Sequence, residues 1–190
     1  MSVSTLVPNE TLTQRLFGRR ELIPPLTNIL WRIEQGVVRT YTWNEDTLNE
    51  EGRIITLGYW GPGDVVGHSL SKVLSYQVEC VTKVEMSVIP THLWAQALEA
   101  VVQHTQQLEQ LLNILHIVPM QERLWHFLVW LGQKFGRDTE QGRLINLRLT
   151  HQQIAEAINT TRVTVLRLLK QLVSEGLLQQ HKRQIILFQQ

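Results

Sequence analysis

Apolar residues recur along this chain with two different periods. Between residues 28 and 88, runs of β-branched and aromatic residues are separated by glycine turns at a spacing of roughly ten residues, which is typical of the strands of a small β-barrel or jelly roll. From about residue 91 the apolar positions follow a helical period. The pattern predicts an α+β fold with an N-terminal β-roll (jelly roll), a long helix and a C-terminal helical region.

The expected elements can be given as residue ranges. Strands are predicted at 29–33, 37–43, 53–60, 65–67, 78–89 and 144–149, with a strand pair that turns near 181–183. Apolar positions predict a short helix at 12–17 and a longer one at 120–135 that ends at Gly136. The polar residues 137–142 are expected to form a loop.

The longest helical pattern is a seam of positions spaced alternately by three and four residues. The members of this seam are Leu98, Val101, Thr105, Leu108, Leu112 and Leu115. Such spacing is typical of a helix that pairs with another helix, and because the chain has no second helix of this kind, the simplest partner is a second copy in a homodimer. The alternative is a helix packed on the barrel, and Val102, Leu111 and Ile114 make the stripe wide enough for both. Pro119 predicts a hinge after the helix.

Residues 149–171 carry the clearest chemical signal, two helices joined by a short turn. Thr150 followed by Gln153 forms a capping box, and the short polar side chains of 159–161 favour a break. In the second helix, 162–172, one face is apolar. Its other face presents Arg162, Val163, Arg167 and Lys170.

This arrangement is a helix-turn-helix, whose second helix enters the major groove of DNA. Arginine suits such a helix because its planar fork can donate two hydrogen bonds to guanine. The alternative is a solvated helical hairpin in an all-α core. The coincidence of turn, cap and basic face favours DNA binding.

The distribution of charge agrees with that interpretation. The chain has 190 residues and a net charge of +1, yet residues 150–190 carry 5 Lys and Arg against 2 Asp and Glu, whereas residues 1–149 carry 13 against 15. A basic end on a nearly neutral body is expected when one part of a protein meets phosphate. The single cysteine, Cys80, excludes an internal disulfide framework and a four-cysteine metal site. With neither a long apolar run nor a signal-peptide pattern, we expect a cytoplasmic protein without a membrane partner.

The order of β-roll, seam helix, hinge and winged helix-turn-helix resembles the cyclic-AMP receptor protein/FNR superfamily of bacterial transcription regulators. The resemblance extends from about Thr27 to the C-terminus. It is densest where FLVWLGQKFG, LTHQQIAEAINTTRVTVLRLLKQL and HKRQIIL resemble the cyanobacterial global nitrogen regulator branch. It implies a β-roll sensor-like domain at 1–97, a dimerisation helix at 98–118 and a winged helix-turn-helix domain at 119–190. It also implies a homodimeric regulator whose partners are double-stranded DNA and RNA polymerase, with no enzymatic activity and no cofactor.

Carried over residue by residue, the resemblance assigns base reading to Arg162, Val163 and Arg167. Val163 stands where the cyclic-AMP receptor branch has a glutamate, and a valine can lie against a thymine methyl group but cannot accept from cytosine. The resemblance thus implies a palindrome of the GTA-N8-TAC kind rather than the TGTGA kind. Phosphate contacts, which set register and salt dependence, are implied for Thr150, Thr161, Lys170, His181 and Lys182.

The sensor half departs from the family's pattern. GYWGPGDVVG resembles the glycine-aspartate turn that leads into the ligand pocket, but His68 replaces a ribose-binding glutamate and Leu74 replaces a phosphate-binding arginine. A leucine cannot neutralise a phosphodiester, so cyclic nucleotide binding is not expected. For 2-oxoglutarate, which the nitrogen-regulator branch binds with arginines and a glutamate, the matching helix positions hold His104 and Glu109.

The candidate effector pocket comprises Gly67, His68, Ser69, Ser75, His104 and Glu109. Whether a small-molecule effector exists is left open. One alternative function is a β-roll ligand-binding or protein-interaction module, regulated by 2-oxoglutarate or another small molecule, for which DNA binding is secondary. A cupin-like metal enzyme is a further alternative, but His68 and His92 are too few and too scattered for a metal site.

Overall fold

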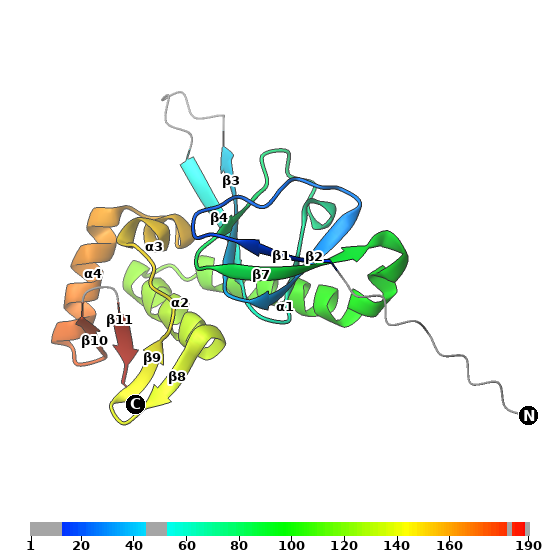
Figure 1. Ribbon diagram of the computed structural model, residues 1–190. Helices are drawn as coiled ribbons and strands as arrows, with labels where there is room; N and C mark the ends of the chain where they lie inside the picture. The colour runs from blue at the N-terminus through cyan, green and yellow to red at the C-terminus, as the bar shows by residue number, and fades with distance from the viewer. Residues whose placement is uncertain (1–12, 45–52, 182–183, 189–190) are drawn as a thin grey trace, which may run out of the picture.

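A computed structural model of the chain describes residues 13–44, 53–181 and 184–188, and its N-terminal half is a β-roll (Figure 1). One antiparallel sheet has the order β1 (Gln14–Phe17), β7 (Val84–Pro90), β2 (Ile29–Gln35) and β5 (Val65–Val66). The facing sheet has the order β4 (Arg53–Trp60), β3 (Val38–Asn44) and β6 (Gln77–Cys80). Short 3-10 helices follow at His68–Leu70 and Thr91–Ala97.

The interior of the β-roll is filled by large side chains. Trp31 and Trp60 are each only 1% exposed, and the ring of Phe17 meets that of Trp31 edge-on at 5.7 Å. Cys80 lies in the same buried cluster, as expected of a small core residue. Burial raises the pKa of its thiol to about 12, so the group stays protonated at neutral pH.

Two expectations for this half were wrong. Gln14–Phe17, part of the helix expected at 12–17, is a strand, because its residues pair with β7 and Phe17 is buried against Trp31. Leu12, also in that helix, lies outside the described residues. The single strand expected at 78–89 is two strands, β6 and β7. Val81 and Thr82 interrupt it, since their N–H groups bond to the carbonyl of Val37 while the chain passes from one sheet to the other.

Two helices connect the β-roll to the C-terminal part. Helix α1 (Leu98–Leu115) buries Ala100 and His104 against the β-roll, and it buries Leu111 in the core that is made mostly by α2 and the C-terminal part. After a short link that ends at Pro119, α2 (Met120–Phe135) begins, with the bounds predicted for the helix at 120–135. Within the part of the chain that the structure describes, no helix is long and apolar enough to cross a membrane.

The C-terminal part is a small sheet with two helices. The sheet has the order β10 (Leu178–His181), β11 (Gln184–Leu187), β9 (Gly142–Ile145) and β8 (Gly136–Thr139). The expected loop at 137–142 is a hairpin instead, stabilised by a hydrogen bond from the Thr139 hydroxyl to the Gly142 carbonyl. The strand expected at 144–149 ends at Ile145, because β9 is paired with β8 and β11 only up to that residue.

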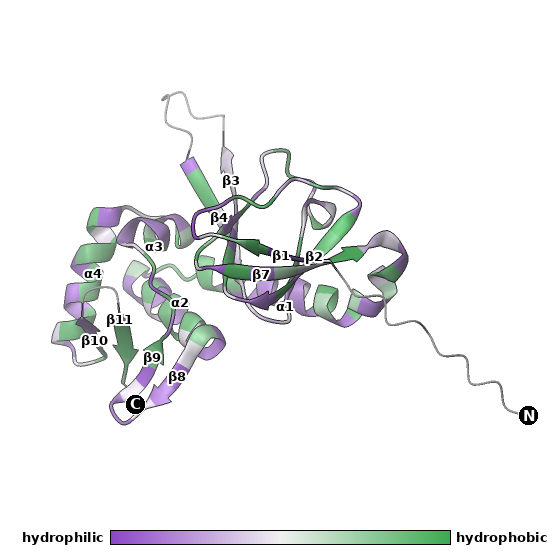
Figure 2. Cartoon of the chain, viewed as in Figure 1, coloured by the Kyte–Doolittle hydropathy of each residue, from purple (hydrophilic) through white to green (hydrophobic). Residues whose placement is uncertain are grey.

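The β-roll and the C-terminal part share one hydrophobic core. Val37, Tyr59 and Val81 of the β-roll lie in the same buried cluster as the inward side chains of α2, α3 (His151–Ala157) and α4 (Arg162–Ser174). The rings of Tyr59 and Phe127 are 6.2 Å apart. Figure 2 shows the corresponding hydropathy, with β4 and β11 mostly hydrophobic and β8 mostly hydrophilic. The C-terminal helices are therefore packed directly on the β-roll.

Candidate nucleic-acid interface

Two side-chain caps fix the positions of α3 and α4. The Thr150 hydroxyl accepts from the Gln153 N–H at 3.1 Å, and the Thr150 N–H donates to the Gln153 side chain at 3.0 Å, so the predicted capping box is confirmed. Between the helices, Asn159 adopts a φ of 59°, a left-handed conformation that asparagine tolerates well. The Thr161 hydroxyl then caps α4 by accepting from the Thr164 N–H at 3.1 Å.

Helix α4 presents one buried and one exposed face. Its buried residues are the four predicted, Val165, Leu168, Leu169 and Leu172. On the opposite side lie Arg162, Val163, Arg167 and Lys170, which we call the recognition face, and all four are exposed. Val163 is 76% exposed, which is unusual for a β-branched apolar residue in the middle of a basic surface. The structure therefore brings the expected base-reading residues together on one accessible surface.

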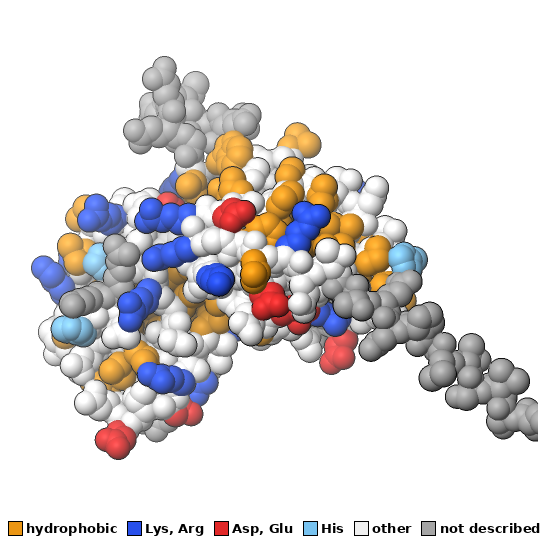
Figure 3. All heavy atoms as spheres, in the orientation of Figure 1, with side chains coloured by type: hydrophobic (Ala, Val, Ile, Leu, Met, Phe, Trp, Pro, Cys, Tyr) orange, Lys and Arg blue, Asp and Glu red, His pale blue; other side chains and the backbone are white. Residues whose placement is uncertain are grey.

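A strand pair lies beside α4 in the position of a wing. β10 and β11 are antiparallel, and His181 ends β10 with an exposed side chain. The Gln180 side chain lies 3.2 Å from the His151 ring and so connects this pair to the start of α3. Lys182, the other wing residue expected to contact phosphate, lies outside the described residues. Figure 3 shows Lys and Arg side chains gathered over the C-terminal part on the visible face.

A buried ion cluster joins the β-roll to α3. Arg39 on β3 is 5% exposed, and its guanidinium contacts Glu79 on β6 at 2.7 Å and Glu156 on α3 at 2.5 Å. Burial alone would lower the pKa of Arg39, but Tyr59 and the two carboxylates outweigh it and raise the pKa, so the group stays charged. The Tyr59 hydroxyl adds a long hydrogen bond, 3.4 Å, to the Gln153 carbonyl.

A second cluster connects the turn at 61–64 to both α1 and α2. Asp64 forms an ion pair with Lys134 on α2 at 2.8 Å and accepts from the Gln107 side chain on α1 at 2.9 Å. Lys134 also donates to the Tyr59 carbonyl at 2.8 Å. Burial lowers the pKa of Lys134, and Asp64 opposes that effect. The motif expected to lead into a ligand pocket thus holds the two connecting helices in place.

The residues of the candidate effector pocket do not form one site. His104 points from α1 into the β-roll, where its ring lies 2.9 Å from the Val65 carbonyl and stacks on Trp60 at 3.7 Å. Burial lowers the pKa of His104, which favours its neutral form. Glu109, five positions along the same helix, is exposed, and Leu74 is fully exposed on its loop.

The remaining polar residues of that candidate pocket are bonded to the chain itself. The His68 ring lies 3.0 Å from the Tyr76 carbonyl, and Ser75 donates to the Trp43 carbonyl at 3.1 Å. Ser69 donates to the Ile29 carbonyl at 3.2 Å and also contacts the Thr27 carbonyl. Gly67 adopts a φ of 156° and a ψ of 158°, a combination that essentially only glycine adopts. The side chains of His68, Ser69 and Ser75 thus each make at least one hydrogen bond within the chain.

Most of the seam of α1 lies on the exposed side of the helix. Leu98 is 64% exposed and Leu112 is 56% exposed, whereas Leu111, on the other side, is 3% exposed. Thr105 bonds to the Val101 carbonyl of its own helix at 3.2 Å. Leu98, Thr105, Leu108 and Leu112 of the seam are therefore accessible, whereas Val101 and Leu115 are partly buried against the neighbouring cores.

Comparisons with known proteins agree with this geometry. Residues 122–189 match the Crp-like helix-turn-helix domain family. The chain is 38% identical over 174 residues to the Regulatory protein CysR of Synechococcus elongatus, an alignment that covers 90% of this chain and 82% of that protein. The chain belongs to the CRP/FNR family of transcription regulators. The family predicted from the sequence is thereby confirmed.

Other members of the CRP/FNR family match over different extents. The Global nitrogen regulator of the same organism is 44% identical over 82 residues, which is 43% of this chain and 37% of that protein. The solved structure of TTHB099, a CRP family regulator of Thermus thermophilus, has a TM-score of 0.75 at 24% identity and covers 92% of both chains. As a member of the CRP/FNR family, the chain is a DNA-binding transcription regulator and not an enzyme.

Sequence reasoning missed the two ion clusters. Arg39 and Glu156 are 117 residues apart, and neither stands in a recognisable motif. The available signal was an arginine in the middle of a strand whose neighbours are mostly uncharged. Such a residue needs a buried partner, but the partner cannot be identified from local spacing.

Proposed function

We propose that this chain acts as a homodimer that reads a palindromic GTA-N8-TAC-like site in double-stranded DNA, with its β-roll acting as a support rather than as a receptor for a small molecule. The observation that carries the proposal is the recognition face of α4, whose side chains are exposed on a helix that is capped by Thr161. Like other DNA-binding regulators it would work in the cytoplasm and contact RNA polymerase at promoters.

Base reading follows from the chemistry of the recognition face. Arg162 lies in the first turn of α4, the part of a recognition helix that reaches deepest into the major groove, and its fork suits guanine O6 and N7. Val163 offers a methyl surface to thymine. Arg167, one turn further, is the second donor. Thr150, Thr161, Lys170 and His181 would contact phosphates on either side.

Dimerisation follows from the seam of α1. Pairing two copies through this seam would bury Leu98, Leu108 and Leu112, which are 37–64% exposed in one chain. A two-fold axis along the seam presents two recognition helices to successive turns of the major groove. The palindromic site is the expected counterpart of that symmetry.

We propose that the β-roll binds no small-molecule effector because its polar side chains are bonded within the chain. A ligand shifts a conformational equilibrium only by binding one state more tightly than the other. Here His68, Ser69 and Ser75 are bonded to backbone carbonyls, and aromatic side chains occupy the interior. A ligand would have to displace these contacts before it could bind.

The test is a mobility shift on a duplex with the GTA-N8-TAC site and on a scrambled duplex, at one stated salt concentration. Arg162→Ala is expected to lose about 1–3 kcal/mol of binding free energy and most of its preference for guanine at the contacted position. Arg137→Ala, which removes an exposed arginine on β8, is the matched control and should keep the preference. Unchanged discrimination in Arg162→Ala would contradict the assignment of this residue.

The effector part of the proposal has its own measurement. DNA affinity is determined with and without 2-oxoglutarate and with and without cyclic AMP, each in excess. The proposal expects the same dissociation constant in all cases. A change of tenfold or more with either compound would favour the alternative, a β-roll that binds a ligand and controls DNA binding.

A further inference from the structure

Two buried ion pairs join the C-terminal part to the rest of the molecule. Arg39 on β3 is paired with Glu156 on α3, and these side chains are 6% and 11% exposed. Asp64, in the turn before β5, is paired with Lys134 on α2, and these side chains are 8% and 16% exposed. Because separating a buried ion pair leaves each charge without its partner, both pairs resist movement of the C-terminal part away from the β-roll.

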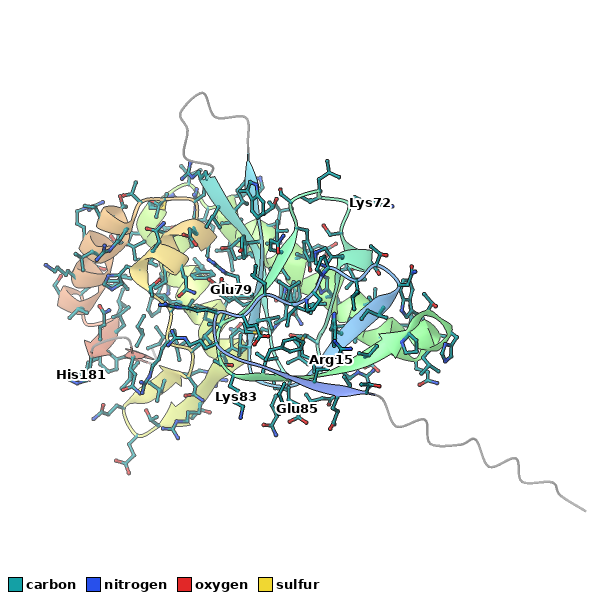
Figure 4. All side chains as sticks on the ribbon, turned by 45° about the horizontal axis from the view of Figure 1, so that its top comes forward. Arg15, Lys72, Glu79, Lys83, Glu85 and His181 are labelled. Carbon is teal, nitrogen blue, oxygen red and sulfur yellow. The ribbon has the colours of Figure 1, made fainter. Side chains whose placement is uncertain are left out.

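Arg39 is held in place by its neighbours within the β-roll. It stands directly opposite Glu79 in the pairing of β3 with β6, and its Nη2 donates to that carboxylate at 2.7 Å. The guanidinium also lies over the ring of Tyr41, 4.8 Å from its centroid. The other nitrogen of the fork, Nη1, donates to Glu156 at 2.5 Å. The β-roll therefore presents a positioned donor to α3, and Figure 4 shows Glu79 where the β-roll meets the C-terminal part.

The orientation of α3 determines that of α4. Ile154 and Ala157 of α3 lie in the same buried cluster as Val165 and Leu169 of α4, and only residues 158–161 separate the two helices. Helix α3 packs on α4 and on β4, an arrangement that can be followed in Figure 1. The recognition face is therefore expected to move together with α3.

The second ion pair links the same parts to α1. Gln107 on α1 donates to Asp64 at 2.9 Å, and Gln110 on the same helix accepts from the indole of Trp130 on α2 at 3.2 Å. Asp64 in turn holds Lys134 on α2. Helix α1, which pairs across the two-fold axis in the proposed dimer, is thereby tied to both the β-roll and α2.

The apolar core does not by itself fix the angle between these parts. Apolar contacts are attractive but non-directional, and the chain between α1 and α2 consists only of residues 116–119. An arginine fork bonded to a carboxylate restricts the angle as well as the distance between two elements. The contact of Arg39 with Glu156 is directional in this sense, and it joins the β-roll to the helix that carries α4.

The spacing of two half-sites on DNA depends on this angle. Each base pair added between them moves the second half-site by about 3.4 Å and rotates it by about 35°. Two recognition helices in a fixed arrangement can follow that change only if the DNA is twisted or if contacts are lost. We propose that Arg39 is a positioning residue, which holds α3 on the β-roll through Glu156 and so sets the half-site spacing that the dimer accepts. This inference rests on the proposed homodimeric DNA reader.

The experiment measures binding to duplexes in which the spacer between GTA and TAC ranges from about 6 to 10 base pairs, by competition in fluorescence anisotropy at one stated salt concentration. Glu156→Gln removes the charge at the α3 end of the contact. Glu79→Gln is the matched control, because it removes a charge from the same guanidinium but leaves the contact with α3 in place. Met86→Ala, in a separate buried cluster of the β-roll, controls for a loss of stability.

We expect the unmodified protein to prefer its best spacer over the neighbouring ones by about tenfold or more, a difference comparable to that caused by one mismatched base pair. In Glu156→Gln this ratio should fall to about threefold or less, while the preference for GTA over a scrambled half-site is kept because the recognition face is unchanged. Arg39→Lys keeps the charge but loses the planar fork, so the ratio should fall to a smaller extent. Glu79→Gln and Met86→Ala should keep the ratio of the unmodified protein.

A full spacer preference in both Glu156→Gln and Arg39→Lys would overturn the inference. An equal loss of preference in Glu79→Gln or in Met86→Ala would also overturn it, because the cause would then be buried charge or stability in general rather than the contact with α3. Equal binding of the unmodified protein to every spacer would contradict it as well. Failure of the unmodified protein to distinguish these sites from a scrambled sequence would instead reject the proposed function.

Discussion

The recognition face of α4 and the candidate effector pocket of the β-roll both contain polar groups, but these groups are used differently. On α4, Arg162, Arg167 and Lys170 are exposed and have no partner among the described residues. In the β-roll, His68 and Ser75 are bonded to carbonyls of the chain. A group that is already bonded must exchange that bond before it can bind a ligand, and the net gain is small. The contrast indicates that the recognition face of α4 is available to bind an external partner, whereas the polar groups of the β-roll stabilise its own fold.

The largest effect is expected from removing the positive charge of Arg39, which joins the β-roll to α3. Arg39→Met leaves the carboxylates of Glu79 and Glu156 without a buried partner and should lower the free energy of unfolding by about 3–5 kcal/mol. Urea unfolding followed by circular dichroism measures it. In contrast, Asp138→Asn, which breaks an exposed ion pair with Arg143, should cost less than about 1 kcal/mol. A similar loss of unfolding free energy in both variants would show that the buried ion cluster of Arg39 contributes no more to stability than an exposed ion pair.

Changing the chemistry of the recognition face should alter specificity but not stability. Val163→Glu gives α4 an acceptor for cytosine N4 and should move the preference at the contacted base pair from thymine toward cytosine by about 1–3 kcal/mol. Competition between duplexes that differ at this base pair measures the change. Val173→Glu, also exposed on α4, should leave the preference as it is. A loss of stability in Val163→Glu would argue against a freely accessible face.

A smaller effect is expected from removing the cap at the start of α4. Thr161→Ala removes the hydroxyl that accepts from the Thr164 N–H, and the free energy of unfolding should fall by about 1 kcal/mol. Thr161→Ser keeps the hydroxyl and should be close to neutral. Thermal unfolding of the unmodified protein and of both variants measures these changes. Equal losses of stability in Thr161→Ala and Thr161→Ser would exclude a capping role for the hydroxyl.

The smallest effect should be a dependence of stability on pH. Burial lowers the pKa of His104 in the folded protein, so the unfolded chain binds a proton at a pH where the folded one does not. Stability should therefore fall as the pH is lowered below about 6.5, the usual value for histidine. His104→Gln should show a shallower decline between pH 7.5 and 5.5 in urea unfolding. Identical slopes would mean that His104 does not contribute.

The features that could be predicted from the sequence are those encoded within a few residues. The capping box at Thr150, the buried face of α4 and the bounds of α2 all depend on neighbours three or four positions apart. Gln14–Phe17 could not be assigned in this way, since its strand partner is β7, far along the chain. The pairing of Arg39 with Glu156 and the burial of His104 depend likewise on tertiary contacts that leave no periodic trace.

The core that Tyr59 shares with Phe127 limits how this chain can be recombined with others. A fragment beginning at α2 would place the apolar surface that normally covers Tyr59, Val37 and Val81 in contact with water. The C-terminal part is consequently not expected to fold normally when it is joined unchanged to another sensor domain. A chimera with another sensor domain would have to exchange β3 and β4 together with α2, or rebuild the apolar contact between them.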